Sequence, residues 1–383
     1  MSAPPASHDR RPLIMIVGMG DLSTRVAKLL AANPATNRLV LAGRDVEGNQ
    51  RLGNLVRFAA ANLGSYPDIA SVSMDLDDIA ATAETLARVR PDVVFMGASL
   101  QAWHVITRLP KDIFEALDEA QFGPWLPMHL TLNYQLMQAV RMSGSHARVV
   151  NAAFPDAVGP VLRQVGLAPT IGIGNVANII PALTFSAAAE LGEPPEDVRV
   201  QLVTQHYFSH YVPRFGTAGD GAYALAVSVQ GVDRTDQVRH ESLFARLTGD
   251  LKRQGGIAGQ HLTAASAVRV LTAMATGSGA FAHVPAPDGL PGGYPVRVDR
   301  DGGTIDLPAG LTLAEAVEIN ERCQRSDGIE AIHADGSVTF TEPEMAIMRK
   351  YLGYECRTLS LPETAVAAAE LRDRFAAFAA TFR

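Results

Sequence analysis

Cysteine and long apolar runs are both scarce in this 383-residue sequence. Its two cysteines, Cys323 and Cys356, lie far apart and outside any Cys-x-x-Cys or Cys/His ligand spacing, which excludes a disulfide framework and a structural zinc site. No apolar run reaches the roughly 18 residues of a membrane-spanning helix, and the first residues, MSAPPASHDRR, hold no apolar signal core. We therefore expect a cytoplasmic protein that has no membrane partner.

Positive charge is also scarce, with 33 Lys and Arg against 40 Asp and Glu and a formal net charge of -7. A protein that binds nucleic acid needs a basic face to displace the counterions of the phosphate backbone. This charge balance argues against nucleic acid as a partner and favours a small-molecule substrate. The hydrophobic fraction of 47% and the length are sufficient for two domains, each with a buried core.

A glycine-containing turn follows the first apolar run in the segment PLIMIVGMGDLSTRVAKLLAAN. Gly18 and Gly20 stand as the first two glycines of a GxGxxG turn, and Ser23 occupies the third position. Such a turn lets backbone amides approach a pyrophosphate at the start of a helix. We therefore predict a dinucleotide site that includes Asp21 and Leu22 as well as these three residues. The alternative is a tight turn with no ligand; the absence of a GK[ST] lysine excludes a P-loop.

The end of the second predicted strand, RLVLAGRD, bears on the choice of nucleotide. An acidic residue there would accept the ribose hydroxyls of NAD, whereas an arginine favours the 2′-phosphate of NADP. The sequence has Gly43 where the acid would stand, followed by Arg44 and Asp45. We therefore favour NADP(H), with NAD(H) possible if Asp45 reaches the ribose. An ordinary surface role for Arg44 is the remaining alternative.

Two further strand ends are candidates for cofactor contact. The run PDVVFMGAS ends in Gly97 and Ala98, whose small size would let the backbone pass close to a nicotinamide. Asp75 and Leu76 follow the third predicted strand and would flank the adenine. Asp75 would alternatively cap the next helix.

Strand and helix patterns alternate from Pro12 to about residue 180. This alternation predicts an α/β fold with an N-terminal Rossmann domain, a doubly wound parallel sheet, at residues 12–178. A disordered tail is expected at residues 1–11, because that stretch has too few apolar residues to offset the entropy of ordering.

The pattern changes at residues 179–383, which we predict to form a C-terminal α+β substrate domain. The segment DVRVQLVTQHYFSHYV is typical of a strand pair, and GGYPVRVDRDGGTIDLP of a hairpin. Amphipathic helices are expected at residues 311–323 and 362–383.

Six segments, in order from Leu13 to about Arg325, resemble the lactate/malate dehydrogenase superfamily. The family's first strand and phosphate turn are matched by IVGMGDLSTRVAKLL, and its second strand and next helix by RLVLAGRDVEGNQRLGNLV. Its asparagine-containing strand end is similar to RVVNAAFPDAV, and its histidine segment to LVTQHYFSHYVP. Its substrate-facing helix resembles HLTAASAVRVLTAM, and its C-terminal hairpin and helix resemble GGYPVRVDRDGGTIDLPAGLTLAEAVEINER. The residues after this point have no counterpart.

This resemblance implies hydride transfer between a nicotinamide and a 2-hydroxy or 2-oxo acid, with a histidine that exchanges the hydroxyl proton. The matching position is His206; His210 competes with it, because both would face the same side of a strand. Two histidines without a catalytic role are the alternative. The resemblance places Asn151 at the cofactor, unless its side chain satisfies a turn. It also implies a homodimer or a higher homo-oligomer.

Two charges of the family pattern are missing from this sequence. The aspartate that orients the histidine and the arginine that binds the substrate would follow PTIGIG, where Asn175 and Asn178 stand instead. Either amide would accept a hydrogen bond from an imidazole without stabilising its charge. Arg214 is a candidate anion-binding residue, and Arg108 stands in an inserted stretch where it would serve as a loop arginine. Both are alternatively surface arginines.

The sequence therefore predicts an NAD(P)-dependent oxidoreductase, acting on a small 2-oxo or 2-hydroxy compound other than lactate or malate, without a metal. An imine- or opine-type reductase and a non-catalytic cofactor-binding relative are the alternatives. A metal-dependent variant that uses His206, His210 and Asp156 is a further one.

Overall fold

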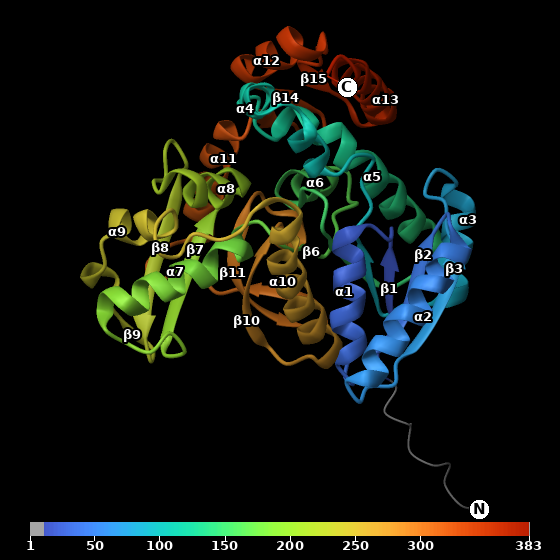
Figure 1. Ribbon diagram of the computed structural model, residues 1–383, viewed down its shortest axis with the longest axis horizontal. Coiled ribbons are helices and arrows are strands. Elements are labelled where there is room, and N and C mark those ends of the chain that lie inside the picture. The colour runs from blue at the N-terminus through green and yellow to red at the C-terminus, as the bar shows by residue number, and fades with distance from the viewer. Residues whose placement is uncertain (1–10, 383) are drawn as a thin grey trace, which may run out of the picture.

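The computed structural model describes residues 11–382, which are arranged around three β-sheets (Figure 1). Of the tail expected at residues 1–11, all but Arg11 lies outside the described residues, and Arg11 donates a hydrogen bond to the Asn37 side chain. No helix in the described part of the chain is long and apolar enough to cross a membrane.

Six parallel strands form the first sheet. They are β1 (Ile14–Val17), β2 (Arg38–Gly43), β3 (Asp68–Ser73), β4 (Val93–Met96), β5 (Arg148–Asn151) and β6 (Ile171–Gly172), in the order β3-β2-β1-β4-β5-β6. A sheet covered on both faces needs strands that are apolar throughout, and β1 is buried along its whole length. Its alternate residues, Ile14 and Ile16 against Met15 and Val17, enter two different cores. The predicted N-terminal doubly wound sheet is confirmed.

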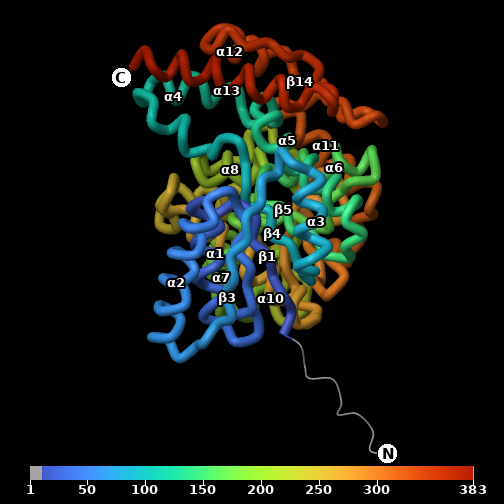
Figure 2. The backbone as a smooth tube through the Cα atoms, turned by 90° about the vertical axis from the view of Figure 1, so that its right-hand side faces the viewer, coloured from blue at the N-terminus to red at the C-terminus, as the bar shows by residue number. Residues whose placement is uncertain are grey.

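Helices cover both faces of this sheet (Figure 2). They are α1 (Asp21–Ala32) and α2 (Val46–Asn62) on one face, and α3 (Ile79–Val89), α5 (Leu126–Ser143) and α6 (Pro155–Arg163) on the other. Two helices begin at aspartates, because the side chains of Asp45 and Asp78 accept hydrogen bonds from the first turns of α2 and α3. The inserted stretch after β4 forms the short segments η1 (Trp103–Arg108), α4 (Lys111–Asp118) and η2 (Gly123–Trp125).

A second, antiparallel sheet follows, in the order β10-β11-β7-β8-β9 with β12 paired to β11. Its strands are β7 (Val198–Thr204), β8 (Tyr223–Val229), β9 (Val232–Asp233), β10 (Ala280–Pro285), β11 (Gly293–Asp299) and β12 (Gly302–Ile305). The predicted hairpin is confirmed as β11–β12, in which Val296 pairs with Ile305. The helices of this part are α7 (Val176–Leu191), α8 (His206–Phe215), α9 (His240–Arg246), α10 (Gly256–Thr276) and α11 (Leu313–Ser326).

The strand pair predicted in DVRVQLVTQHYFSHYV is wrong in its second half. The first half is β7, but it pairs with β8, and the residues after it form α8. The Gln205 side chain accepts a hydrogen bond from the Tyr207 backbone and so caps the new helix. Tyr207, Phe208 and Val212 then form one buried face at helical spacing.

The last part of the chain packs against the first domain, not against the second sheet. It comprises β13 (Ile329–Ile332), β14 (Val338–Phe340), α12 (Glu342–Leu352), β15 (Thr358–Leu359) and α13 (Thr364–Ala380). Both views show α12 and α13 beside α4 and α5 (Figures 1 and 2). Phe340, Leu371 and Phe375 belong to the same apolar core as Met15. The helix predicted at 362–383 is present, but from residue 329 onwards the chain departs from the predicted domain at 179–383.

We expect Phe375→Ala to lower the free energy of unfolding by about 3 to 5 kcal/mol, because it opens a cavity in this core. The Phe375 ring is 4% exposed and meets Trp125 edge-on, with 5.7 Å between the ring centroids. Urea unfolding followed by tryptophan fluorescence measures the change. Val366→Ala, on the same helix but 71% exposed, is the control and should change stability by less than about 0.5 kcal/mol. Equal losses in the two variants would show that α13 is not an integral part of the core.

Candidate functional site

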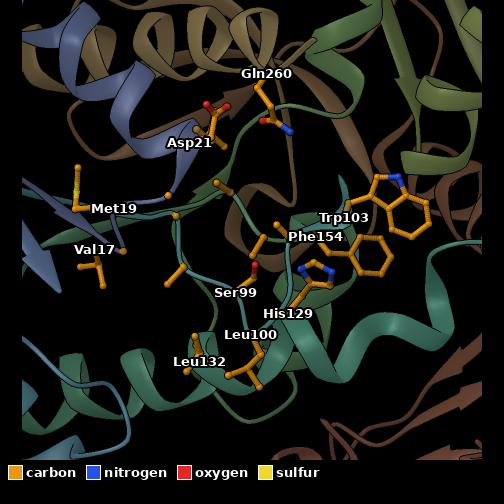
Figure 3. Close-up of a pocket in the computed structure, with 18 of the residues that line it drawn as sticks. Val17, Met19, Asp21, Ser99, Leu100, Trp103, His129, Leu132, Phe154 and Gln260 are labelled. Carbon is orange, nitrogen blue, oxygen red and sulfur yellow. The ribbon is translucent and has the colours of Figure 1, made fainter. Parts of the chain in front are cut away.

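A cleft of about 1080 Å³ opens at the carboxyl ends of the parallel strands, the edge where open α/β sheets bind ligands. Figure 3 shows Asp21 and Met19 at one end, with Trp103, His129 and Phe154 gathered at the other. Most of the residues predicted from the sequence line it. These are Gly18, Gly20, Asp21, Leu22, Gly43, Arg44, Asp75, Leu76, Gly97, Ala98, Asn178, His206 and His210. Ser23, Asn151 and Arg214 do not line it.

The turn after β1 requires glycine at its first position. Gly18 has a φ of +80°, and a Cβ placed on it would lie 2.5 Å from the Cβ of Ala98. Gly20 precedes the first residue of α1, and a Cβ there would meet nothing within 4 Å on the cleft side or elsewhere. Gly20, Asp21 and Leu22 line the cleft, so the first turn of α1, whose backbone amides have no helical partner, borders it as an anion-binding helix terminus requires.

Ser23 has a packing role. It is fully buried, and a Cβ placed on Gly97 would lie 2.1 Å from the Ser23 hydroxyl oxygen. Only a small residue at this position allows α1 to approach the end of β4, which is the role of the third glycine in the pattern. Asp21 and Leu22, by contrast, face the cleft, and Asp21 is paired with Arg25 at 2.8 Å.

The end of β2 presents one free cation to the cleft. Arg44 is exposed and has no ion-pair or hydrogen-bond partner within residues 11–382. The Asp45 carboxylate accepts a hydrogen bond from the Gly48 backbone at 2.8 Å and so is engaged as a helix cap. The neighbouring Asp75 accepts a hydrogen bond from the Asp77 backbone. The alternative in which Asp75 caps α3 is wrong, because Asp78 does so.

Asn151 is buried behind the cleft at the end of β5. Its side chain accepts a hydrogen bond from the Ala153 backbone N–H at 2.8 Å and donates one to the Ala153 carbonyl at 3.1 Å. These bonds satisfy a turn, which is the alternative that the sequence left open. The cleft is reached instead by Phe154, whose φ of 43° is unusual for a residue with a side chain.

His206 and His210 lie on the same face of α8, one helical turn apart. Their ring centroids are 5.2 Å from each other, and both rings border the cleft. The sequence placed both on one side of a strand. That geometry is wrong, but the shared face is retained, because residues i and i+4 of a helix also face the same way.

The Asp327 carboxylate holds His206. Its Oδ2 lies 3.0 Å from Nδ1 of His206 and accepts a hydrogen bond from the Gln205 side chain at 3.1 Å. Asp327 is wholly buried and follows the last residue of α11. Sequence reasoning missed it, because it stands 121 residues from His206, just beyond the end of the family resemblance. No local pattern marks it.

The charges around His206 set it apart from the other imidazoles. Burial lowers the pKa of His129 and of His210 to about 3. Burial also acts on His206, but the negative charges of Asp327 and Asp156 raise its pKa above the ordinary value of 6.5. Of these three histidines, His206 is therefore the one suited to holding and releasing a proton near neutral pH.

Neither asparagine of the segment after β6 orients His206, so that expectation is wrong. Asn175 donates a hydrogen bond to Asp156, and Asn178 donates one to the Thr263 hydroxyl at 3.0 Å. Burial raises the pKa of Asp156, a fully buried carboxyl, to about 6. Asn175 has a φ of 48° and a ψ of −111°, a strained backbone that is typical of functional sites.

The predicted arginines lie outside the cleft. The Arg214 guanidinium is paired with Asp118, and Arg108 is exposed at the end of η1. Of all arginine and lysine side chains in the described residues, Arg44 and Arg372 alone line the cleft. Arg372 comes from α13 and is an exposed side chain.

The wall beside His206 is aromatic. The Phe122 ring lies between two imidazoles, with its centroid 4.8 Å from that of His129 and 4.8 Å from that of His206. Phe154 and Trp103 pack edge-on against Phe122, at 4.5 and 4.9 Å. The surroundings of the dyad of His206 and Asp327 are thus apolar on this side, which strengthens the electrostatic interaction within the dyad.

Comparison with solved structures shows that this chain has the fold of the lactate and malate dehydrogenases. Malate dehydrogenase of Cryptosporidium parvum is 16% identical, with 83% of this chain and 98% of that chain covered and a TM-score of 0.57. Lactate dehydrogenase of the same organism, complexed with lactic acid and nicotinamide adenine dinucleotide, is 18% identical, with 84% and 99% covered and a TM-score of 0.54. Malate dehydrogenase of Aeropyrum pernix is 18% identical, with 81% and 95% covered and a TM-score of 0.52. No family model and no curated protein matches the sequence.

We expect Asp327→Asn to lower the pKa of His206 by about one to three pH units. Burial lowers this pKa, and the variant lacks the carboxylate charge that opposes the effect. An NMR titration of the histidine rings measures this pKa. Since the folded-state pKa of His206 is raised, the charged dyad stabilises the fold below the unfolded value of 6.5 and ceases to do so as pH rises through the folded pKa. The stability lost in the variant should therefore shrink as pH rises.

Glu330→Gln removes an exposed carboxylate three residues further on and is the matched control. It should leave the pKa of His206 unchanged. An unaltered His206 titration in Asp327→Asn would show that this carboxylate does not govern the imidazole.

Proposed function

We propose that this protein is an NAD(P)-dependent oxidoreductase, a divergent relative of the lactate and malate dehydrogenases, that moves a hydride between a nicotinamide and a small hydroxy or oxo compound. The observation that carries the proposal is the presence, in one cleft, of the glycine turn and of a histidine paired with a buried aspartate. The shared fold supports it, since one of the structural neighbours holds lactic acid and nicotinamide adenine dinucleotide.

The cofactor would extend along the carboxyl edge of the sheet. Its pyrophosphate would lie at Gly18 and Gly20, where the first turn of α1 borders the cleft. The adenosine would lie over the ends of β2 and β3, and the nicotinamide would reach Gly97 and Ala98. This order follows the strands in space, from the edge of the sheet towards the histidines.

NADP(H) is the nucleotide that the end of β2 favours. Arg44 presents a guanidinium with no partner in the described chain, and a 2′-phosphate accepts hydrogen bonds from such a group in bidentate fashion. The Asp45 carboxylate, which would repel that phosphate and accept the hydroxyls of NAD, is occupied by the first turn of α2. A free cation and an engaged anion together favour the phosphorylated nucleotide.

His206 would act as the acid/base. In oxidation, one ring nitrogen would take the proton of the substrate hydroxyl, and a bound nicotinamide would accept the hydride from the carbon that carries this hydroxyl. The imidazolium that forms is stabilised by Asp327, which already raises the pKa of the ring. Since Nδ1 faces the carboxylate, Nε2 is the nitrogen that would meet the substrate.

The substrate would carry less negative charge than a dicarboxylate, with an apolar group beside its reacting carbon. Of the arginines and lysines in residues 11–382, only Arg44 and Arg372 line the cleft, so a dicarboxylate such as malate would find few counter-ions there. Phe122, Phe154 and Trp103 offer ring faces and edges instead. Homo-oligomer formation and a cytoplasmic location stay predictions of the sequence.

Replacing Arg44 by alanine should weaken NADPH binding about 10- to 100-fold, because a charged hydrogen bond to the phosphate is lost. Binding of NADH should change little. Nicotinamide fluorescence in a titration gives both constants. Arg51→Ala, an exposed arginine of α2 that pairs with Glu47, is the control and should alter neither. An equal loss for both nucleotides would mean that Arg44 does not read the 2′-phosphate.

Replacing His206 by glutamine should lower kcat by about 100- to 10 000-fold while NADPH binding is retained, because the acid/base is lost and the cofactor contacts are not. The assay follows NADPH oxidation with a panel of oxo compounds, in which phenylpyruvate should be preferred to oxaloacetate. Turnover that requires an added amine would instead identify an imine reductase. If the wild type binds NADPH tightly but turns over none of these compounds, the protein binds the cofactor without catalysing this reaction.

A further inference from the structure

His206 and His210 have the spacing of a metal-chelating helix. Two histidines at positions i and i+4 of a helix direct their rings to one side, and this arrangement holds zinc in helices that bear an H-x-x-x-H pattern. Their ring planes are inclined by 32°, with 5.2 Å between the centroids, and both rings border the cleft. The pair therefore offers two nitrogen donors to a single ion.

Asp327 supplies a third donor at the same place. One ligand atom from each of His206, His210 and Asp327 lies within 4.8 Å of the other two. Gln205 donates a hydrogen bond to one carboxylate oxygen of Asp327 and so fixes its orientation. Carboxylates that bind metals in proteins are generally held by such hydrogen bonds from a neighbouring group.

Two atoms of this cluster are buried without any hydrogen-bond partner among the described residues. They are Nδ1 of His210 and Oδ1 of Asp327. Burying an acceptor that forms no bond costs free energy, and native structures usually provide it with a partner. A cation bound between the two elements, α8 and the end of α11, would remove that cost.

We propose that His206, His210 and Asp327 form a binding site for a divalent transition-metal cation, with zinc as the best fit. Two imidazoles and one carboxylate are a ligand set of catalytic zinc sites, which keep a fourth position for water or substrate. Nitrogen donors disfavour magnesium and calcium, which prefer oxygen. The fourth position would face the cleft, because both histidine rings border it.

The acid of this cluster differs from the one that the sequence suggested. Asp156 was the carboxylate of the metal-dependent alternative, but it is hydrogen-bonded to Asn175 and is not among the three clustered ligands. A cation held by Asp327 would be a Lewis acid for a carbonyl or hydroxyl oxygen in the cleft. With the cation bound, His206 would serve as its ligand, and metal-bound water would take over the proton exchange assigned to the free imidazole. The site stands on its own geometry and does not depend on nucleotide binding.

Direct measurement of bound metal tests the proposal. The full-length protein is stripped with a chelator and dialysed against Zn²⁺, and its zinc content is determined by elemental analysis. Co²⁺ is then titrated in place of Zn²⁺, because its visible absorption reports the geometry of its ligands. We expect one ion per chain and an absorption band typical of four-coordinate cobalt.

His210→Ala should weaken binding of Co²⁺ by at least about 100-fold. Even the loss of a group that only hydrogen-bonds to a metal ligand lowers metal affinity by about 10- to 100-fold. His333→Ala removes an exposed histidine of the β13–β14 hairpin and should bind as the wild type does. Far-ultraviolet circular dichroism shows whether each variant is folded. If His210→Ala is misfolded, His210→Gln replaces it in the same titration.

The proposal is overturned if the wild type retains no stoichiometric zinc, or if the folded His210 variant binds Co²⁺ as tightly as the wild type. Loss of metal in His333→Ala to the same extent would also overturn it, because the ion would then bind elsewhere. Metal binding without NADPH binding would contradict the oxidoreductase alone, and NADPH binding without metal would contradict the metal site alone. The two proposals therefore fail separately.

Discussion

Burying a carboxylate costs free energy unless hydrogen-bond donors compensate for the lost water. Asp327 is such a carboxylate, and its donors, Gln205 and His206, come from the point where β7 ends and α8 begins. The contact joins the start of α8 to the residue that follows α11. It also fixes the end of α11 against the cleft, and from this point the chain continues to the first domain. The proton affinity of His206 and the path of the last residues thus depend on one interaction.

Local patterns explain what the sequence predicted correctly. The apolar run of β1 indicated a strand buried on both faces, and Gly18 marked a turn that only glycine fits beside Ala98. The segment QHYFSHYV misled, because its aromatic and β-branched residues favour a strand. Its polar and apolar pairs nevertheless recur every four residues, close to the helical period, and Gln205 caps a helix there. Asp327 could not be predicted, since a contact between residues 121 positions apart leaves no local trace and its own surroundings, SDG, resemble an ordinary turn.

The carboxylate beside His206 does not come from the segment where the family resemblance led us to expect it. Where the family pattern has an acid after β6, this chain has Asn175 and Asn178, and both amides bind other partners. The carboxylate beside the imidazole comes from the end of α11 instead. A carboxylate at hydrogen-bond distance raises the pKa of an imidazole whichever segment of the chain supplies it.

The packing of α13 on α5 also bears on how the protein is made. Chains are synthesised from the N-terminus, and domains tend to fold as they emerge from the ribosome. The first domain here is discontinuous, because part of its core, including Phe340, Leu371 and Phe375, is encoded at the far end of the chain. Until those residues have been translated, Trp125 and its neighbours on α5 lack their cover. During synthesis, the first domain therefore keeps an exposed apolar face until the second domain and the residues after it have been translated.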